Sequence, residues 1–167
     1  YSRRYEAVCQ QAEEFGFTPC ATIREAVADA EFVFVMVGYP ADVEQVFCGP
    51  KGILENAPAG AVVVDMTTSS PTLAQKLYAL GKEKGIAVMD APVSGGDKGA
   101  REATLSIMVG GDEEAFEKAL PLFECMGKSV LLMGPAGNGQ HTKAANQIAV
   151  AGATAAYTEA ILYAEKA

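Results

Sequence analysis

The sequence has almost nothing that could hold a metal ion. It contains a single histidine, His141, and its cysteines show neither a CxxC pair nor another metal-ligand spacing. The four cysteines are Cys9, Cys20, Cys48 and Cys125. We therefore expect no structural metal, and we expect reduced thiols and a cytoplasmic location.

Positive charge and long hydrophobic runs are also scarce. The formal net charge of −8 argues against nucleic acid or an anionic membrane as the main partner. The Ala-rich stretch 148–156 is too short to span a bilayer, and we expect no signal peptide before the predicted elements. With 167 residues, 50% of them hydrophobic and 20% charged, the composition is that of about one globular domain.

Apolar runs of strand length alternate with helical patterns along the chain. They lie at 32–38, 61–66, 86–90, 105–111 and 128–134. Continuous apolar runs are typical of parallel strands that are covered on both faces. The alternation predicts an α/β fold with a mostly parallel sheet and helices on both of its faces.

Local signals predict where the helices begin and end. An amphipathic helix over 2–15 ends at Gly16, and Thr22 with Glu25 fits a capping box for a short helix. The predicted buried face of the first helix consists of Tyr5, Val8, Cys9, Ala12 and Phe15. Further helices are expected from 23 to 30, from 42 to 47, from 71 to about 84, after 112, and after the loop that starts at 134.

The stretch GPAGNGQHTKAANQ, residues 134–147, joins a glycine-rich loop to a helix. Lys143, Asn146 and Gln147 stand at i, i+3 and i+4, so they share one helical face about a turn from the positive N-terminal end. Small apolar neighbours and the helix dipole both disfavour the ammonium form of the lysine. Lys143 is therefore a candidate for proton exchange near neutral pH, and the alternative is an ordinary surface lysine.

Glycine, proline and hydroxyl residues follow several predicted strands. They are Gly38 to Pro40, Thr67 and Thr68, Ser94 to Gly96, and the loop that leads to Lys143. Ligands of open α/β sheets bind beyond the carboxyl ends of the strands, so we expect these turns to line one crevice. Each of them also has the composition of an ordinary turn.

The segments DAPVSGGDKGAREATLSIMVGG and GPAGNGQHTKAANQ resemble the β-hydroxyacid dehydrogenase family. This family includes 3-hydroxyisobutyrate dehydrogenase, tartronate semialdehyde reductase and glyoxylate/succinic semialdehyde reductase, with 6-phosphogluconate dehydrogenase as a distant relative. The resemblance implies a Rossmann-like dinucleotide-binding domain over 1–134 and the start of an all-helical domain over 135–167. It also implies a strand with a GxGxMG loop before Tyr1 and more helices after Ala167, so we expect a piece of a longer enzyme.

The resemblance further implies a role for each matching residue. Lys143 matches the catalytic lysine, and Asn146 and Gln147 match amides that orient the substrate. The residues implied to contact the substrate acid are Ser94, Gly95 and Gly96. The residues implied to contact the cofactor are Val37, Gly38, Tyr39, Pro40, Thr67 and Thr68, of which Thr68 lies on the nicotinamide side.

The start of the chain, YSRR, predicts a preference for NADP over NAD. An acidic residue after the second strand of a dinucleotide fold binds the ribose 2′-hydroxyl and repels a 2′-phosphate. Ser2 occupies that place and is followed by Arg3 and Arg4. Guanidinium groups pair with phosphate oxygens through charge-assisted hydrogen bonds, and the alternative is a solvated basic helix start.

Together these residues predict an oxidoreductase that transfers a hydride between NADP(H) or NAD(H) and a small 3-hydroxy acid or semialdehyde. We expect a homo-oligomer, such as a dimer, once the chain is complete. Two alternatives stay open: a catalytically silent NADP-binding or interaction module of the same fold, and 6-phosphogluconate dehydrogenase. Lys143 favours an enzyme, and TLSIMVGG resembles the branch that acts on small hydroxy acids.

Overall fold

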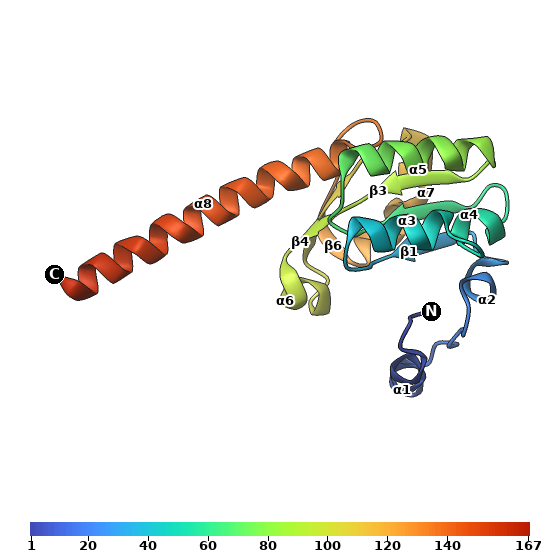
Figure 1. Cartoon of the computed structure of the whole chain (residues 1–167), viewed down its shortest axis with the longest axis horizontal. Coiled ribbons are helices and arrows are strands. Elements are labelled where there is room, and N and C mark those ends of the chain that lie inside the picture. Colours follow the sequence, from blue (N-terminus) through green and yellow to red (C-terminus); the bar gives the residue numbers. More distant parts are fainter.

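The computed structural model describes all 167 residues and contains two three-stranded sheets (Figure 1). The first consists of the parallel strands β1 (Phe32–Val35), β2 (Val62–Asp65) and β3 (Ala87–Asp90), in that order. In the second, β5 (Leu105–Val109) is parallel to β6 (Gly127–Leu132) and antiparallel to β4 (Val93–Ser94). The predicted α/β fold with a mostly parallel sheet is confirmed.

The two sheets meet at the end of β3. The backbone N–H of Asp90 donates to the Gly110 oxygen at 3.0 Å, and the N–H of Gly110 donates to the Asp90 oxygen at 2.7 Å. Because this bridge is antiparallel, the carboxyl ends of β3 and β5 lie together. Residues that follow either strand therefore reach the same edge of the molecule.

Helices follow or precede most strands. They are α1 (Tyr5–Phe15), α2 (Ile23–Val27), α3 (Pro40–Cys48), α4 (Ile53–Asn56), α5 (Pro71–Glu83), α6 (Gly96–Arg101), α7 (Glu113–Glu124) and α8 (Asn138–Lys166). The sequence did not predict α4, α6 or β4, because such short elements leave no measurable periodicity. None of the helices combines the length and the apolar composition needed to cross a membrane.

Strand β2 shows why helices cover both faces of the first sheet. Its side chains alternate between two hydrophobic cores, as the pleat requires. Val64 packs in the core that contains Phe123 of α7, whereas Val63 packs in the core that contains Phe47 of α3 and Leu77 of α5. The run AVVVDM is thus apolar throughout because each face of the strand meets a different layer of helices.

Strand β1 is less covered than the sequence predicted. It is the edge strand of the first sheet, so it has a neighbour on one side only. Phe34 contacts Phe123 edge to face, with ring centroids 5.8 Å apart, yet Phe34 and Met36 both stay exposed. Phe32 packs against one hydrophobic core and Val33 against the other, so both faces of this strand are covered as predicted, but less completely.

Helix α1 stands apart from the sheets (Figure 1). Gly16 ends it in the left-handed conformation, with φ of 73°, as predicted. Of the predicted buried face only Val8 is buried, and Tyr5 and Phe15 are exposed. The amphipathic pattern was correct for a helix but did not identify a surface for that face to cover.

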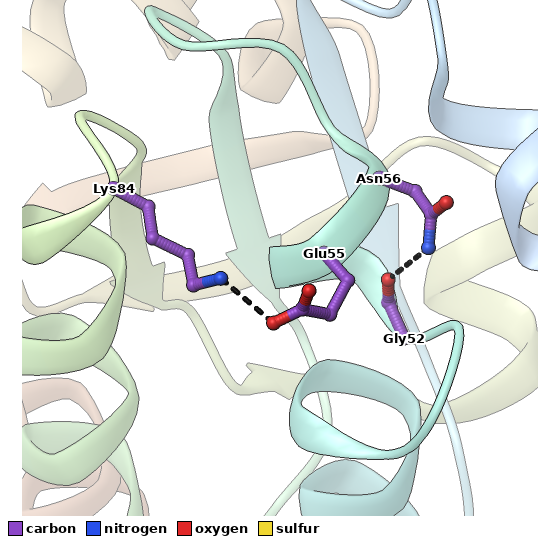
Figure 2. A network of polar contacts seen from close by, with 4 residues as sticks. All are labelled: Gly52, Glu55, Asn56 and Lys84. Carbon is purple, nitrogen blue, oxygen red and sulfur yellow. Dashed lines mark hydrogen bonds and ion pairs between the residues drawn. The ribbon is translucent and has the colours of Figure 1, made fainter.

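Polar contacts hold the short helices α2 and α4, which precede β1 and β2 in the chain. Thr22 caps α2 by accepting from the N–H of Glu25 at 3.2 Å, as predicted, although α2 ends at Val27. Figure 2 shows that Lys84, after α5, pairs with Glu55 of α4 at 2.7 Å. The Asn56 side chain donates to the Gly52 oxygen at 2.8 Å, so this bond spans the short helix itself, whereas the Lys84–Glu55 pair joins it to α5.

Helix α8 starts at the sheet edge and then leaves it. Figure 1 shows it extending far beyond the body of the molecule. Its buried residues are Gly139, Gln140 and Lys143, all in its first turns. From Gln147 onwards every residue is exposed. The interaction of α8 with the sheets is therefore confined to its N-terminal part.

Candidate functional site

A buried carboxylate at the end of β3 holds the start of α8. One oxygen of Asp90 accepts from the N–H of Gly137 at 2.7 Å, and the other accepts from the N–H of Gln140 at 2.8 Å. The first amides of a helix have no partner within the helix, so a carboxylate at this place is favourable. Burial raises the pKa of Asp90, and these backbone donors oppose the rise.

Glycine is required where α8 meets the two strands. A Cβ on Gly139 would clash with the backbone oxygens of Met108 on β5 and Asp90 on β3. Gly137, just before the helix, has φ of 93°, which is strained for other residues. The glycines of this loop thus allow the helix to approach the ends of both sheets.

Lys143 lies one turn beyond this junction and is only 6% exposed. It is not the surface lysine of the alternative interpretation. Burial lowers its pKa, and its Nζ makes no hydrogen bond or ion pair within the chain. The only buried polar side-chain atoms without a partner are Ser69 Oγ and Asn146 Oδ1, so Nζ keeps access to solvent. The amine is therefore available to a bound molecule.

The two amides predicted beside Lys143 differ in their surroundings. Asn146 is half-buried, and its Oδ1 is enclosed without a hydrogen-bond donor. Gln147 is exposed. A buried acceptor without a donor is costly, so Asn146 is the amide with the stronger need for a partner.

Thr67 joins the turns that follow β1 and β2. Its Oγ1 accepts from the N–H of Val37 at 3.0 Å, and its own N–H donates to Asp65 Oδ1 at 3.0 Å. Thr67 is buried, whereas Thr68 is exposed. The hydroxyl of Thr67 therefore organises the turn, and Thr68 is the threonine that can face a ligand.

The side chain of Gln140 ties the turn after β2 to α8. Its Nε2 donates to the Thr67 oxygen at 2.7 Å, and its Oε1 accepts from the N–H of Ser69 at 2.8 Å. The predicted cofactor turns after β1 and β2 are thus connected to the helix that carries Lys143.

A second buried carboxylate, Asp65, lies at the end of β2. Burial raises its pKa to about 6, the hydrogen bonds from Thr67 oppose the rise, and the negative charge of Asp90 adds to it. Sequence reasoning missed Asp65, Asp90 and Gln140. Each aspartate is the only charged residue of its apolar strand, and this pattern could have drawn attention to Asp65 and Asp90.

The Ser94 turn is not joined to this network. Ser94 pairs with Ser106 across the β4–β5 ladder, and no hydrogen bond connects residues 94–96 to α8. Gly95 and Gly96 have φ of 133° and 62° and begin the short helix α6. The structure thus links three of the four predicted turns through hydrogen bonds, and the Ser94 turn is connected to them through the chain that follows Asp90 and through its pairing with β5.

The predicted adenosine-side residues lie against the turn after β1. Arg3 forms an ion pair with Asp42 at 3.1 Å, and Asp42 also accepts from the N–H of Tyr39 at 3.1 Å. The hydroxyl of Ser2 accepts from the N–H of Arg4 at 3.3 Å. Arg3 and the turn at Gly38 are therefore neighbours, as a shared cofactor contact requires.

Residues 1–134 match the family described as the NAD binding domain of 6-phosphogluconate dehydrogenase. The chain is 52% identical over 145 residues to the oxidoreductase YkwC of Bacillus subtilis, a match that covers 87% of this chain and 50% of that protein. It is 42% identical over 160 residues to 2-hydroxy-3-oxopropionate reductase of Escherichia coli, covering 96% and 55% of the two chains.

A solved structure of Mycobacterium tuberculosis 3-hydroxyisobutyrate dehydrogenase with L-serine has the same fold. It superimposes with a TM-score of 0.89 and 36% identity, covering 98% of this chain and 55% of that one. The chain therefore spans about half the length of the relatives that it matches.

Proposed function

The chain belongs to the β-hydroxyacid dehydrogenase family, and from this membership we propose that its protein transfers a hydride between a nicotinamide cofactor and a small 3-hydroxy acid or the matching semialdehyde. The observation that carries the proposal is Lys143. It is a buried lysine with a lowered pKa and a free Nζ, on a helix that is hydrogen-bonded to the predicted cofactor turn.

The residues at the carboxyl edge of the first sheet fit a nicotinamide cofactor. Gly38, Tyr39, Pro40 and Thr68 are all exposed there, beyond the ends of parallel strands. When bound, the cofactor supplies or accepts the hydride. The chain itself contributes the turns after β1 and β2, whose relative position is fixed by the hydrogen bond between Val37 and Thr67.

Lys143 moves the proton. In the direction of reduction, negative charge develops on the carbonyl oxygen of the substrate, and Nζ donates a proton to it. In the direction of oxidation, the neutral amine accepts the proton of the hydroxyl group. A lysine with an ordinary pKa would hold its proton too tightly for the second step, so the lowered pKa suits this role.

The remaining predicted residues bind the acid. The family resemblance assigns the carboxylate to the backbone amides of Gly95 and Gly96 and to the hydroxyl of Ser94. Asn146 and Gln147 orient the reacting oxygen. The i, i+3 and i+4 spacing that places both amides on the helical face of Lys143 supports this assignment.

We further propose that the cofactor is NADP in preference to NAD. No acidic residue is present among the first four positions, and Arg3 and Arg4 are both exposed. Arg3 already pairs with Asp42, so a 2′-phosphate would share its guanidinium with that carboxylate or displace it. The test is kcat/KM with NADPH against NADH for the parent and Arg3→Ala. Equal values in the parent, or an unchanged ratio in the variant, would contradict the preference.

A homo-oligomer is the proposed assembly. Large apolar side chains along the outer part of α8 are exposed, including Ile148 at 76% and Tyr163 at 77%. Exposed apolar surface of this kind is covered by further protein, and because the chain spans about half the length of its relatives, the rest of the polypeptide or a second subunit can cover it. Light scattering on the protein from the complete reading frame is expected to give the mass of at least two subunits, and a monomer mass would contradict the proposal.

The reaction is tested with the protein expressed from the complete reading frame. It is assayed with reduced cofactor and glyoxylate, succinic semialdehyde or tartronate semialdehyde in turn, and with oxidised cofactor and 3-hydroxyisobutyrate. Cofactor absorbance is expected to change with at least one of them. A folded protein that binds the cofactor and turns over none of the four would contradict the proposed function.

A further inference from the structure

Gln140 is the most deeply buried polar residue near the candidate site, at 1% exposed. It is too enclosed to touch a substrate, and it has no place in the proton transfer described above. Burial of an amide is costly unless both of its polar atoms are paired. Both are paired here, and both partners belong to the turn that faces the predicted nicotinamide site.

We infer that Gln140 is a positioning residue, whose amide locks the turn at 67–69 to the first turn of α8 and so sets Lys143 against the bound cofactor and substrate. The inference rests on the proposed function. Its physical basis is that Gln140 and Lys143 are three residues apart and therefore lie on the same side of α8. A shift of the Gln140 amide is transmitted directly to the lysine.

Two anchors of different kinds act on the start of α8. Asp90 holds the backbone amides of Gly137 and Gln140, which fixes where the helix begins. Both of these bonds end on one carboxylate at the end of β3, so they hold the helix start to that strand. The side chain of Gln140 bonds to a different strand end, beyond β2, and ties the helix start to that turn as well.

No other side chain of α8 forms a hydrogen bond with the turn after β2. Every residue from Gln147 onwards is exposed, so the outer part of the helix packs against nothing in this chain. A displacement of about 1 Å in a reacting group can lower a rate about 10²-fold. The amide of Gln140 is therefore expected to affect the rate of the chemical step more than the affinity for either ligand.

The chemistry of the amide suggests a pair of variants. Gln140→Met keeps the length of the side chain and removes both hydrogen bonds. Gln140→Glu keeps the shape, but an ionised carboxylate cannot donate to the Thr67 oxygen. When protonated, the carboxylic acid can donate to Thr67 and accept from Ser69, so it restores both bonds.

The charged groups around position 140 favour this protonation. Asp65 on β2 and Asp90 on β3 are buried nearby, and both disfavour a further negative charge. Lys143, on α8 itself, acts in the opposite sense, and His141 is exposed. The activity of Gln140→Glu relative to the parent should therefore rise as the pH falls.

The experiment measures kcat, KM and the cofactor dissociation constant against pH for the parent, both variants and Gln10→Glu, which makes the same change on the exposed surface of α1. We expect Gln140→Met to lose kcat about 10²-fold, with much smaller changes in KM and cofactor binding. Gln140→Glu should lose as much at alkaline pH and recover toward acid pH, and Gln10→Glu should match the parent. A parent-like kcat in Gln140→Glu, or a loss of kcat that is the same at every pH, would overturn the inference. This test needs Gln140→Glu alone, so it also holds if Gln140→Met does not fold.

A readout that needs no turnover separates this inference from the proposed function. The pKa of Lys143 is measured by NMR titration of the parent and of Gln140→Met, which removes the two hydrogen bonds without adding a charge beside the lysine. Without these bonds the helix start is no longer held to the turn at 67–69 and Lys143 becomes more exposed, so its pKa should move up toward the ordinary value. An unchanged pKa would overturn the positioning role, whereas a parent that lacks turnover on every substrate would overturn the proposed function alone.

Discussion

The first turns of α8, up to Asn146, and its longer outer part form one continuous helix with opposite surroundings. The first part holds Gln140 and Lys143, both buried, and is bonded to the ends of β2 and β3. The outer part, from Gln147 onwards, is exposed at every residue, including Ile148 and Tyr163. This difference shows that hydrogen bonds to the ends of β2 and β3 set the position of the first turns of α8, which carry Lys143. The apolar side chains of the outer part need a partner that this chain does not supply.

The largest expected effect on stability concerns the sheet edge that receives the first turns of α8. The pKa of Asp65 in the folded protein is about 6, above its unfolded value of about 4. Its contribution to stability is therefore fully present below about pH 4 and is lost as the pH rises through about 6. A shift of about two units corresponds to about 3 kcal/mol.

We therefore expect the unfolding free energy of the parent to fall by about 3 kcal/mol relative to Asp65→Asn between about pH 4 and pH 8. Denaturant titrations of both proteins at several pH values measure this difference. Glu159→Gln, on the exposed outer part of α8, is the control and should follow the parent. Parallel pH profiles for the parent and Asp65→Asn would show that the carboxylate is not held as the structure indicates.

Alanine substitutions at Gly139, in the first turns of α8, and at Gly152, in its outer part, should change stability in opposite directions. A Cβ on Gly139 would clash with backbone oxygens of β3 and β5, which cannot move aside easily. We expect Gly139→Ala to destabilise the protein by about 1–3 kcal/mol, the usual cost of overpacking. Thermal or denaturant unfolding measures the change, and a parent-like stability would mean that α8 does not approach the strands as closely as described.

The corresponding change in the outer part should have the opposite sign. No atom lies within 4 Å of the Cβ position of Gly152, and the residue is exposed within a helix. Alanine is favoured over glycine there by about 1 kcal/mol, so Gly152→Ala should stabilise the chain slightly. Destabilisation by the same substitution in the protein from the complete reading frame would instead locate a close partner surface at this position.

Local signals explain what the sequence could predict. The glycine after α1, the Thr22 cap and the proline that opens α5 each act within one turn of helix, so their neighbours in the sequence suffice. The apolar run of β2 likewise reports burial on both faces. The face of α1 could not be predicted in this way, because its burial depends on a distant surface that the pattern does not identify.

In the candidate site too, local sequence signals identify some residues, whereas long-range contacts involve others. Lys143 and the turns after β1 and β2 could be proposed as site residues from the sequence because each stands beside a strand end or a glycine-rich loop. The residues that bring them together could not. Gln140 bonds Thr67 across 73 positions, and its backbone bonds Asp90 across 50, so no local pattern could have revealed either contact.

The central claim is that Lys143 transfers the proton, and the most direct test compares two lysines of the same helix. In the protein from the complete reading frame, kcat and the cofactor dissociation constant are measured for Lys143→Ala and for Lys166→Ala, which lies on the exposed outer part. The account predicts that Lys143→Ala lowers kcat by about 10²–10⁴-fold with cofactor binding nearly intact, and that Lys166→Ala resembles the parent. A Lys143→Ala variant that kept more than about a tenth of the parent kcat would contradict it.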